Sequence, residues 1–190
     1  MTSKQIIITI ALIASTLFSY TQNLERFKKN NKYGFKDSTG AIVVEAKYDM
    51  VNDFSEGLTR VFIGNWKTGK YGFINKNGKE IVQCKYDYAD DFYSFRNGYC
   101  KVRIGNWENC KYGIINKEGR EIIPCEYDYI NMLEISEGLI RVRIGDIKTG
   151  KFGIVNFENK EMLPCKYNYI SQFSSGLAYV FVGEQTMMVK

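Results

Sequence analysis

The chain has 190 residues, of which 26 are Lys or Arg and 21 are Asp or Glu, so its formal net charge at pH 7 is +5. This small excess is spread along the chain and does not form the basic stripe of a nucleic-acid-binding domain, so we expect no nucleic-acid partner. Fourteen Tyr and twelve Phe against two Pro favour β-strands over helices or disorder, and the absence of His removes the commonest general base and metal ligand.

The N-terminal residues 1–21 are predicted to be a signal peptide. Lys4 gives a positive start, and residues 6–18 form an apolar run that is too short for an ordinary membrane span. Ser19 and Thr21 are small residues just before the expected cleavage site. An uncleaved N-terminal anchor is the alternative interpretation.

Cleavage after residue 21 predicts an exported protein, located in the periplasm, in the cell envelope or outside the cell. It is not expected to be an integral membrane protein once the signal peptide is removed. Residues 22–31 are a polar lead-in, and residues 32–190 are one repeat domain.

Four copies of one short unit make up this domain. The copies begin with the phrases Lys32-Tyr33-Gly34, Lys70-Tyr71-Gly72, Lys111-Tyr112-Gly113 and Lys151-Phe152-Gly153. The predicted units cover residues 32–69, 70–110, 111–150 and 151–190. A period of this length marks a solenoid, a propeller or an array, in which neighbouring units bury a shared core.

The first strand of a unit is followed by a predicted hairpin turn. In the second unit, residues 70–75 alternate between the two faces of a short strand. The Asn77-Gly78 pair then predicts a two-residue turn in which both residues have positive φ. Gly or Asn recurs at the second position in every unit, as expected where positive φ is required.

The next segment of the second unit, residues 80–88, also alternates. Val82, Cys84 and Tyr86 are predicted to share the face that points to the core. Later units have Pro at the position of Gln83, and Pro is excluded from regular central strands. We therefore expect two short pieces joined by a kink or a bulge in place of one continuous strand.

The last strand of the second unit is predicted at residues 99–104, after a glycine-containing turn at residues 92–98. Val102 and Ile104 are expected to face inward, together with the equivalent residues of the other units, and Lys101 is expected to face outward. Each unit thus supplies about three short antiparallel strands. The fold class is all-β, a tandem array that forms an open, curved, solenoid-like stack; a closed four-bladed propeller is the alternative.

These phrases resemble the WG-repeat family, which is named for a Trp-Gly pair in the first strand of its unit. The resemblance rests on the phrases Tyr71-Gly72-Phe73-Ile74, Ile123-Pro124, Tyr127-Asp128, Phe54-Ser55-Glu56-Gly57-Leu58 and Phe173-Ser174-Ser175-Gly176-Leu177. It covers residues 32–183 and departs from the family at the tryptophan, which is replaced by Tyr or Phe in all four units. The resemblance implies an array with a role in interaction. We expect no cofactor.

No catalytic or metal-binding group stands out. Asp49, Asp87 and Asp128 recur once per unit, whereas a catalytic carboxylate pair needs two different surroundings, so we interpret them as structural partners of turns or of Lys and Arg. Cys84 and its equivalents Cys125 and Cys165 occupy a position that is Ala in the first unit, which indicates a small packed side chain, with a disulfide or soft-metal site as the alternative.

One candidate interaction surface remains. Trp66 and Trp107 lie at the same position of the turn between units, in line with Ile147, and are predicted to form a stacking platform or, alternatively, to fold back over the joint between units. The basic residues of the last strands complete this candidate surface: Arg60, Lys101, Arg103, Arg141 and Arg143. They are predicted to form a ladder that meets an anionic glycan or an acidic protein, or to be a solvated sheet face.

We therefore expect a non-catalytic binding or scaffold module at the cell envelope or outside the cell, with a protein or an anionic glycan as partner. A hydrolase that acts on envelope polymers is the alternative from another class, and it would require a polar site unique to one unit. The polar positions of this chain recur instead. A purely structural repeat without a ligand is the third possibility.

Overall fold

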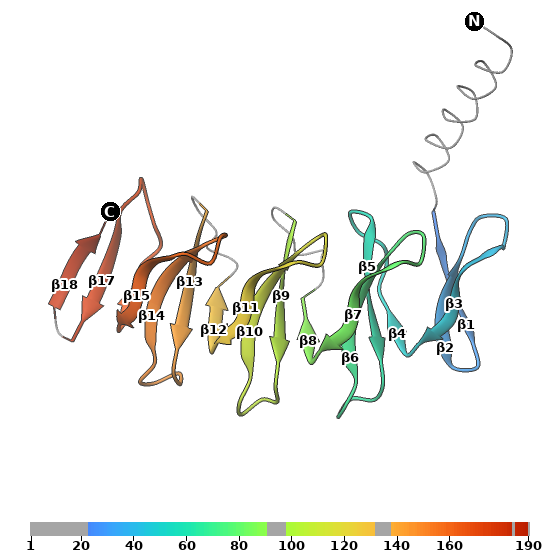
Figure 1. Ribbon diagram of the computed structural model, residues 1–190, viewed down its shortest axis with the longest axis horizontal. Coiled ribbons are helices and arrows are strands. Elements are labelled where there is room, and N and C mark those ends of the chain that lie inside the picture. Colours follow the sequence, from blue (N-terminus) through green and yellow to red (C-terminus); the bar gives the residue numbers. More distant parts are fainter. Residues whose placement is uncertain (1–22, 91–97, 132–137, 184, 190) are drawn as a thin grey trace, which may run out of the picture.

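The computed structural model describes residues 23–90, 98–131, 138–183 and 185–189. The predicted signal peptide lies outside these residues, as does most of the turn expected at residues 92–98. Within the described ranges the chain forms eighteen strands and no helix, and the strands build five antiparallel sheets that follow one another in a row (Figure 1). The all-β prediction is confirmed.

The first and fifth sheets have three strands each, and the other three sheets have four. The first sheet contains β1 (Glu25–Lys29), β2 (Lys32–Lys36) and β3 (Ile42–Tyr48). The second contains β4 (Met50–Val51), β5 (Leu58–Ile63), β6 (Lys70–Asn75) and β7 (Glu80–Tyr86). The third contains β8 (Tyr88–Ala89), β9 (Tyr99–Ile104), β10 (Lys111–Asn116) and β11 (Glu121–Tyr127). The fourth contains β12 (Tyr129–Asn131), β13 (Leu139–Ile144), β14 (Lys151–Asn156) and β15 (Glu161–Tyr167), and the fifth contains β16 (Tyr169–Ile170), β17 (Ala178–Val182) and β18 (Gln185–Val189).

The array is open. The sheet that contains β1 and the sheet that contains β18 lie at opposite ends of the row (Figure 1), and each sheet pairs only its own strands. The described strands therefore form a linear stack, and the four-bladed propeller considered as an alternative is not the arrangement found.

The repeat units of the sequence do not coincide with the sheets of the structure. The second unit supplies β6 and β7 to the second sheet and β8 and β9 to the third sheet. The chain crosses between sheets at Asp87, directly after β7, and not at the proline position where the sequence suggested a break. Each of the first three units therefore contributes four strands and the fourth contributes five, where three were predicted, and every unit ties two neighbouring sheets together.

Four apolar cores fill the spaces between consecutive sheets. We call the side of a sheet that faces the next sheet its forward side and the other its backward side. In β6, Phe73 packs forward with the third sheet and Ile74 packs backward with the first sheet, and both are fully buried. Tyr86 belongs to the forward core, as predicted from its alternation. Each inner sheet is thus buried on both sides, which explains why neither face of its third strand, such as β6, is polar.

A bulge changes the facing of the cysteine position. Between the pairs Tyr71–Tyr86 and Phe73–Val82, β7 advances four residues while β6 advances two. The extra residues turn Cys84 backward, where it packs against the core between the first and second sheets. The prediction that Cys84 shares a face with its neighbours was wrong because the bulge breaks the alternation. A kink or bulge was predicted at the proline position, but β7 continues through it as one strand, so the prediction of two separate pieces was wrong.

The same bulge explains the glycine of the repeated first phrase. A Cβ atom on Gly72 would lie 2.5 Å from the carbonyl oxygen of Val82, and one on Gly113 would lie 2.6 Å from that of Ile123. The bulged strand passes across the middle strand at this point, and only a residue without a side chain leaves room for its backbone.

Two further details differ from the sequence predictions. The exposed fractions of Ile63, Ile104 and Ile144 are 40%, 45% and 51%, although all three were predicted to face inward. They are the last residues of their strands, beyond the cores that the neighbouring sheets cover. In the hairpin after β6, Gly78 has positive φ but Asn77 does not; the turn is held by the Asn75 side chain, whose Oδ1 accepts hydrogen bonds from the backbone of Asn77 and Lys79.

The polar lead-in supplies the first strand of the array. Strand β1 pairs with β2 as β5 pairs with β6, so Arg26 stands at the position of Arg60. Glu25 and Lys36 occupy backward positions that are Thr59 and Ile74 in the second sheet, and their side chains form an ion pair of 3.4 Å. Charged residues therefore close the N-terminal end of the array.

Candidate binding edge

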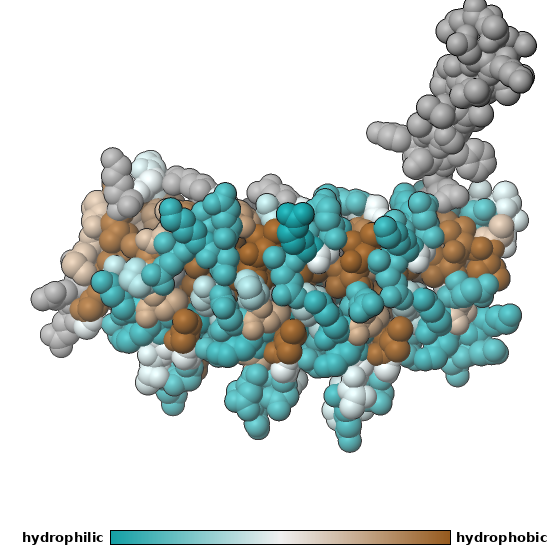
Figure 2. All heavy atoms as spheres, viewed as in Figure 1, coloured by the Kyte–Doolittle hydropathy of each residue, from teal (hydrophilic) through white to brown (hydrophobic). Residues whose placement is uncertain are grey.

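Three loops project on one side of the array, where they join β5 to β6, β9 to β10 and β13 to β14 (Figure 1). They contain residues 64–69, 105–110 and 145–150. We call these loops, together with the last residues of the strands that lead into them, the turn edge. Figure 2 shows a row of separate apolar spots next to these projecting loops.

The side chains at the tips of the loops are almost fully exposed. The exposed fraction is 87% for Trp66, 81% for Trp107 and 84% for Ile147. The tryptophans therefore do not fold back over the joints between units, which was the alternative interpretation. At the base of each loop stands one of the exposed isoleucines described above, so the turn edge presents three pairs of apolar side chains, one pair per sheet.

A recurring clamp holds neighbouring loops in register. Asp87, at the crossing between the second and third sheets, accepts a hydrogen bond from Lys70 Nζ through Oδ1 at 2.5 Å. Its Oδ2 accepts the backbone N–H of Gly105 at 2.9 Å. Lys70 follows the loop that carries Trp66, and Gly105 begins the loop that carries Trp107. One carboxylate therefore connects two consecutive loops of the turn edge.

The clamp is repeated at the first and third crossings. Asp49 binds Lys32 Nζ at 2.6 Å and the Gly64 N–H at 2.8 Å. Asp128 binds Lys111 Nζ at 2.7 Å and the Gly145 N–H at 2.8 Å. At the fourth crossing the equivalent residue is Asn168, whose Oδ1 accepts the Gly183 N–H at 3.1 Å. The aspartates are thus structural partners of Lys and of a turn, as the sequence indicated.

The clamp lowers the pKa of each aspartate. For Asp49 the hydrogen bond from Lys32 is the main cause. For Asp87 and Asp128 burial alone would raise the pKa, but the hydrogen bonds from the lysine and from the turn glycine outweigh burial and hold the pKa below its ordinary value. The three carboxylates are therefore charged acceptors at neutral pH, and each glycine N–H bond is charge-assisted.

Inside each loop a side chain at the second position fixes the backbone. Asn65 Oδ1 accepts hydrogen bonds from the N–H groups of Lys67 and Thr68, at 2.9 and 3.2 Å. Asn106 makes the same contacts with Glu108 and Asn109, at 3.0 and 2.9 Å. Asn and Asp favour this local turn because their short side chains reach the backbone two and three residues on. The tryptophan lies between the fixed ends of this turn.

Arg103 supports one tryptophan from below. Its guanidinium lies 4.0 Å from the ring centre of Trp107 and 5.4 Å from that of Tyr88, and only 5% of the residue is exposed. This cation–π contact orients the indole and leaves its other face to solvent. In the second sheet the equivalent position is Phe62, and the nearest cation to Trp66 is Lys67, at 5.0 Å from its ring centre.

The other predicted basic residues are partly buried and contact neighbouring rings. Arg60 lies on the forward side of the second sheet, 5.0 Å from the ring centre of Tyr71, and donates a hydrogen bond of 2.5 Å to the Ala89 carbonyl of the third sheet. Arg141 donates in the same way to the Ile170 carbonyl of the fifth sheet. These two arginines connect consecutive sheets.

Lys101 and Arg143 complete the set of predicted basic residues. Lys101 lies 5.7 Å from the ring centre of Tyr112 and 3.7 Å from Asp90, and Arg143 lies 5.4 Å from the ring centre of Tyr129. The predicted ladder is therefore an ordered stack of cations and aromatic rings between the sheets. Of its members, Arg103 alone contacts a tryptophan of the turn edge among the described contacts.

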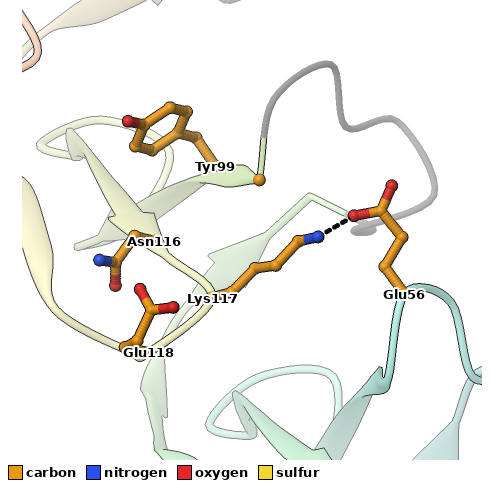
Figure 3. A pocket seen from close by; sticks show the side chains of 6 residues that line it. Glu56, Tyr99, Asn116, Lys117 and Glu118 are labelled. Carbon is orange, nitrogen blue, oxygen red and sulfur yellow. Dashed lines mark ion pairs between the residues drawn. The ribbon is translucent and has the colours of Figure 1, made fainter.

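Further polar features lie outside the turn edge. A hollow between the second and third sheets is lined by Glu56, Tyr99 and Lys117, and the ion pair between Lys117 and Glu56 spans it (Figure 3). The cysteines are free thiols, and burial raises the pKa of Cys84 to about 11 and that of Cys125 to about 12. In the described part of the chain, no three Cys, Asp or Glu side chains are placed to hold a metal ion.

Sequence reasoning found the tips of the turn edge and the structural role of the aspartates, but it missed the base of the edge and the link that each aspartate makes between two loops. The exposure of Ile63, Ile104 and Ile144 was not signalled by alternation, because alternation specifies a face of a strand and not the distance from the covering sheet. The clamp did have a signal: Lys, Asp and Gly recur at fixed positions in the first three units, and the fourth unit replaces Asp with Asn168.

The stacked sheets and the repeated clamps define a tandem β-repeat protein. The family model described as WG containing repeat matches residues 33–65, 71–106, 112–146 and 152–184, and the chain belongs to this family. It is a repeat family and not a known family of enzymes. Among curated proteins, none matches the chain. No helix in the described ranges is long and apolar enough to span a membrane.

Proposed function

We propose that this protein is a non-catalytic binding module, which uses the turn edge to hold an extended partner at the cell envelope or outside the cell. The observation that carries this proposal is the exposure of Trp66 and Trp107, at 87% and 81%, on loops that the Asp87 clamp connects. Large exposed aromatic side chains on a fixed backbone are typical of binding surfaces, because they give contact area with little loss of conformational entropy.

The repetition of the edge favours an extended partner. Stacked sheets are spaced by about 10 Å, so equivalent side chains recur at about that interval along the edge. When one partner makes several linked weak contacts, the first contact raises the effective concentration of the partner at the next site. The overall affinity then exceeds that of any single contact, which suits a polymer and not a small compact ligand.

The charges of the loop tips favour a protein segment over an anionic glycan. Lys67 and Lys148 are balanced by Glu108 and Asp146, so the three loops carry no net charge. An anionic glycan would be bound mainly through net positive charge, whereas aromatic and aliphatic contacts are effective with an extended polypeptide. The anionic glycan is the second candidate, supported by Arg103 beneath Trp107.

Several observations support a non-catalytic role over the alternative of an envelope hydrolase. The carboxylates that recur in the repeats are held by Lys and by backbone N–H groups, and their pKa values are lowered, whereas a general acid needs a raised pKa. Glu56 beside the hollow is neutralised by Lys117. These carboxylates lack the contrasting pair of environments that acid–base catalysis requires.

Recovery of partners from an envelope extract tests the proposal. The immobilised protein is expected to retain a partner that the double variant Trp66→Ala/Trp107→Ala does not retain, while the far-UV circular dichroism of both proteins is the same. Met162→Ala is the matched control, because Met162 is 49% exposed and lies near the start of β15 (Glu161–Tyr167), at the opposite end of its hairpin from the turn edge. Equal recovery with the double variant would contradict the proposal.

A defined probe distinguishes the two partner classes. The chain has two tryptophans, both at the turn edge, so their fluorescence reports binding there. Heparin, used as a model polyanion, is expected to change this fluorescence weakly and only at low salt. A strong change that persists at physiological salt would favour the glycan partner over the protein segment.

The proposed location has its own test. The basis is the positive start, the apolar run and the small residues before position 22, which lie outside the described residues. The mature protein from the native cells is expected to begin at or near Gln22 and to be recovered outside the cytoplasm. An intact Met1 on membrane-embedded material would contradict it.

A further inference from the structure

The forward side of the fifth sheet is exposed where the forward sides of earlier sheets are buried. Leu58 and Phe73 of the second sheet are 7% and 0% exposed, because the third sheet covers them. At the equivalent positions of the fifth sheet, Leu177 and Met188 are 39% and 56% exposed. The apolar character of the position is kept, but the covering sheet is absent from the described chain.

The other described residues of this surface are uncharged as well. Tyr179 replaces the arginine that in the second and fourth sheets reaches forward to a carbonyl of the next sheet, and it is 53% exposed. Phe181 and Tyr169 extend the surface, with their ring centres 5.8 Å apart. Strands β16, β17 and β18 contain no charged residue, and β18 is the edge strand of its sheet. We call the forward side of these strands the terminal face.

At the opposite end of the array, the backward side carries a charged pair as well as Phe27. On the backward side of the first sheet, Glu25 and Lys36 stand where inner sheets have buried residues, and 67% and 39% of these two side chains are exposed. A head-to-tail contact between two copies would place this ion pair against Met188 and remove it from water. Desolvating charges without new partners is costly, so the two ends of the array do not match each other.

Two terminal faces do match each other. We infer that the protein forms a two-fold dimer in which the terminal faces of two copies pack together, end to end. The contact covers apolar sheet faces as the four inner cores do, but it joins two forward sides, whereas each inner core joins a forward side to a backward side. It places the uncharged Leu177, Tyr179 and Met188 of each copy against the same residues of the other. A two-fold contact uses one surface twice and closes, so it gives a dimer and not a filament.

The mass of the protein in solution tests this inference. The protein, purified as the cell processes it, is expected to show twice the chain mass by sedimentation equilibrium. Tyr179→Lys and Met188→Lys each place a charge in the contact and are expected to weaken the dimer at least about tenfold. Both positions are more than half exposed within one chain, so the fold is expected to be kept. Ile147→Lys, on the turn edge, is the control and is expected to leave the mass unchanged.

The length of the particle tests the arrangement. An end-to-end dimer has about twice the maximum dimension of one chain in small-angle X-ray scattering, whereas a side-by-side dimer through the turn edge has nearly the dimension of one chain. A monomer at all concentrations, a mass that grows without limit, or a dimer that Ile147→Lys disrupts and Tyr179→Lys does not would each overturn the inference. The outcome does not depend on the proposed partner of the turn edge.

Discussion

Tyr86 and Trp107 show two opposite uses of an aromatic side chain in this repeat. Tyr86 is fully buried in the core between two sheets, whereas Trp107 is 81% exposed on a loop a short distance away. The difference follows from the architecture. Stacked sheets cover one another's faces but not their edges, so strand interiors hold the stack together and the loops between strands are left free. Stability and binding are therefore assigned to different positions of the same unit.

The largest expected effect is at the core. Tyr86→Ala is expected to lower the free energy of unfolding by about 3–5 kcal/mol, because it removes a large buried ring and leaves a cavity between the second and third sheets. The Tyr86 hydroxyl also donates a hydrogen bond of 2.8 Å to Glu121 of the next sheet. Urea unfolding measures the loss. Gln83→Ala, at an exposed position of the same strand, is the control, with an expected change within about 0.5 kcal/mol, and equal losses would contradict the assignment of faces.

The glycine under the bulge gives the next effect. Gly113→Ala places a Cβ 2.6 Å from the Ile123 carbonyl oxygen, so the backbone of β11 must move. Overpacking of this kind is expected to lower the free energy of unfolding by about 1–3 kcal/mol, as measured by urea unfolding. An unchanged free energy would show that the bulged strand does not need this close approach.

The clamp predicts how stability depends on pH. Because the folded-state pKa of Asp87 and Asp128 lies below the ordinary value of 3.8, their stabilisation is complete well above that pH. It is lost as the pH falls through the lowered pKa. The double variant Asp87→Asn/Asp128→Asn is expected to lose about 1–3 kcal/mol at pH 7 and to unfold less steeply with acid, as measured by urea unfolding across pH. The same pH dependence in both proteins would contradict the clamp.

The smallest effect concerns the joint between the third and fourth sheets. Lys85 pairs with Glu121 at 2.8 Å across the preceding joint, but here the lysine is replaced by Glu126, whose negative charge acts on Tyr127 together with that of Glu161. Burial is the main cause that raises the pKa of Tyr127 to about 12, and the charge of Glu126 adds to it. Glu126→Lys is expected to stabilise the protein by about 0.2–1 kcal/mol in thermal unfolding. Destabilisation would show that the hydrogen bond of 3.3 Å from Asn159 Nδ2 to Glu126 Oε1 outweighs the repulsion between the two acidic residues.

The sequence predicted the repeat, the glycine-containing turns and the burial of Tyr86, because these follow from local periodicity and from backbone geometry. It did not predict that a unit divides between two sheets, since the crossing at Asp87 depends on which strands pair at long range. The facing of Cys84 was missed because a bulge of two extra residues is not visible in an alternating pattern. Strand β1 was missed because it has a charged residue, Glu25, at a position where inner strands have a buried residue, so its sequence lacks the alternation of apolar and polar residues.

The candidate site was predicted in part for a related reason. Trp66 and Trp107 were identified from their common place in a turn, which is a local property. The role of Arg60 was not, because its acceptor, the Ala89 carbonyl, lies in another sheet. Whether a basic residue faces solvent or the next sheet depends on how the sheets stack, and the sequence of a single unit does not specify this stacking.

The fluorescence of the native protein tests the central claim most directly, namely that both tryptophans stand in water on a fixed scaffold. The account predicts that the folded protein emits at nearly the same wavelength as the urea-unfolded chain and that acrylamide quenches it almost as efficiently. The variants Trp66→Phe and Trp107→Phe assign the signal to each loop, and Trp107 is expected to be quenched slightly less because Arg103 covers one face of its ring. A blue-shifted emission that acrylamide quenches poorly would mean that the tryptophans belong to the core, and it would contradict the turn edge as a binding surface.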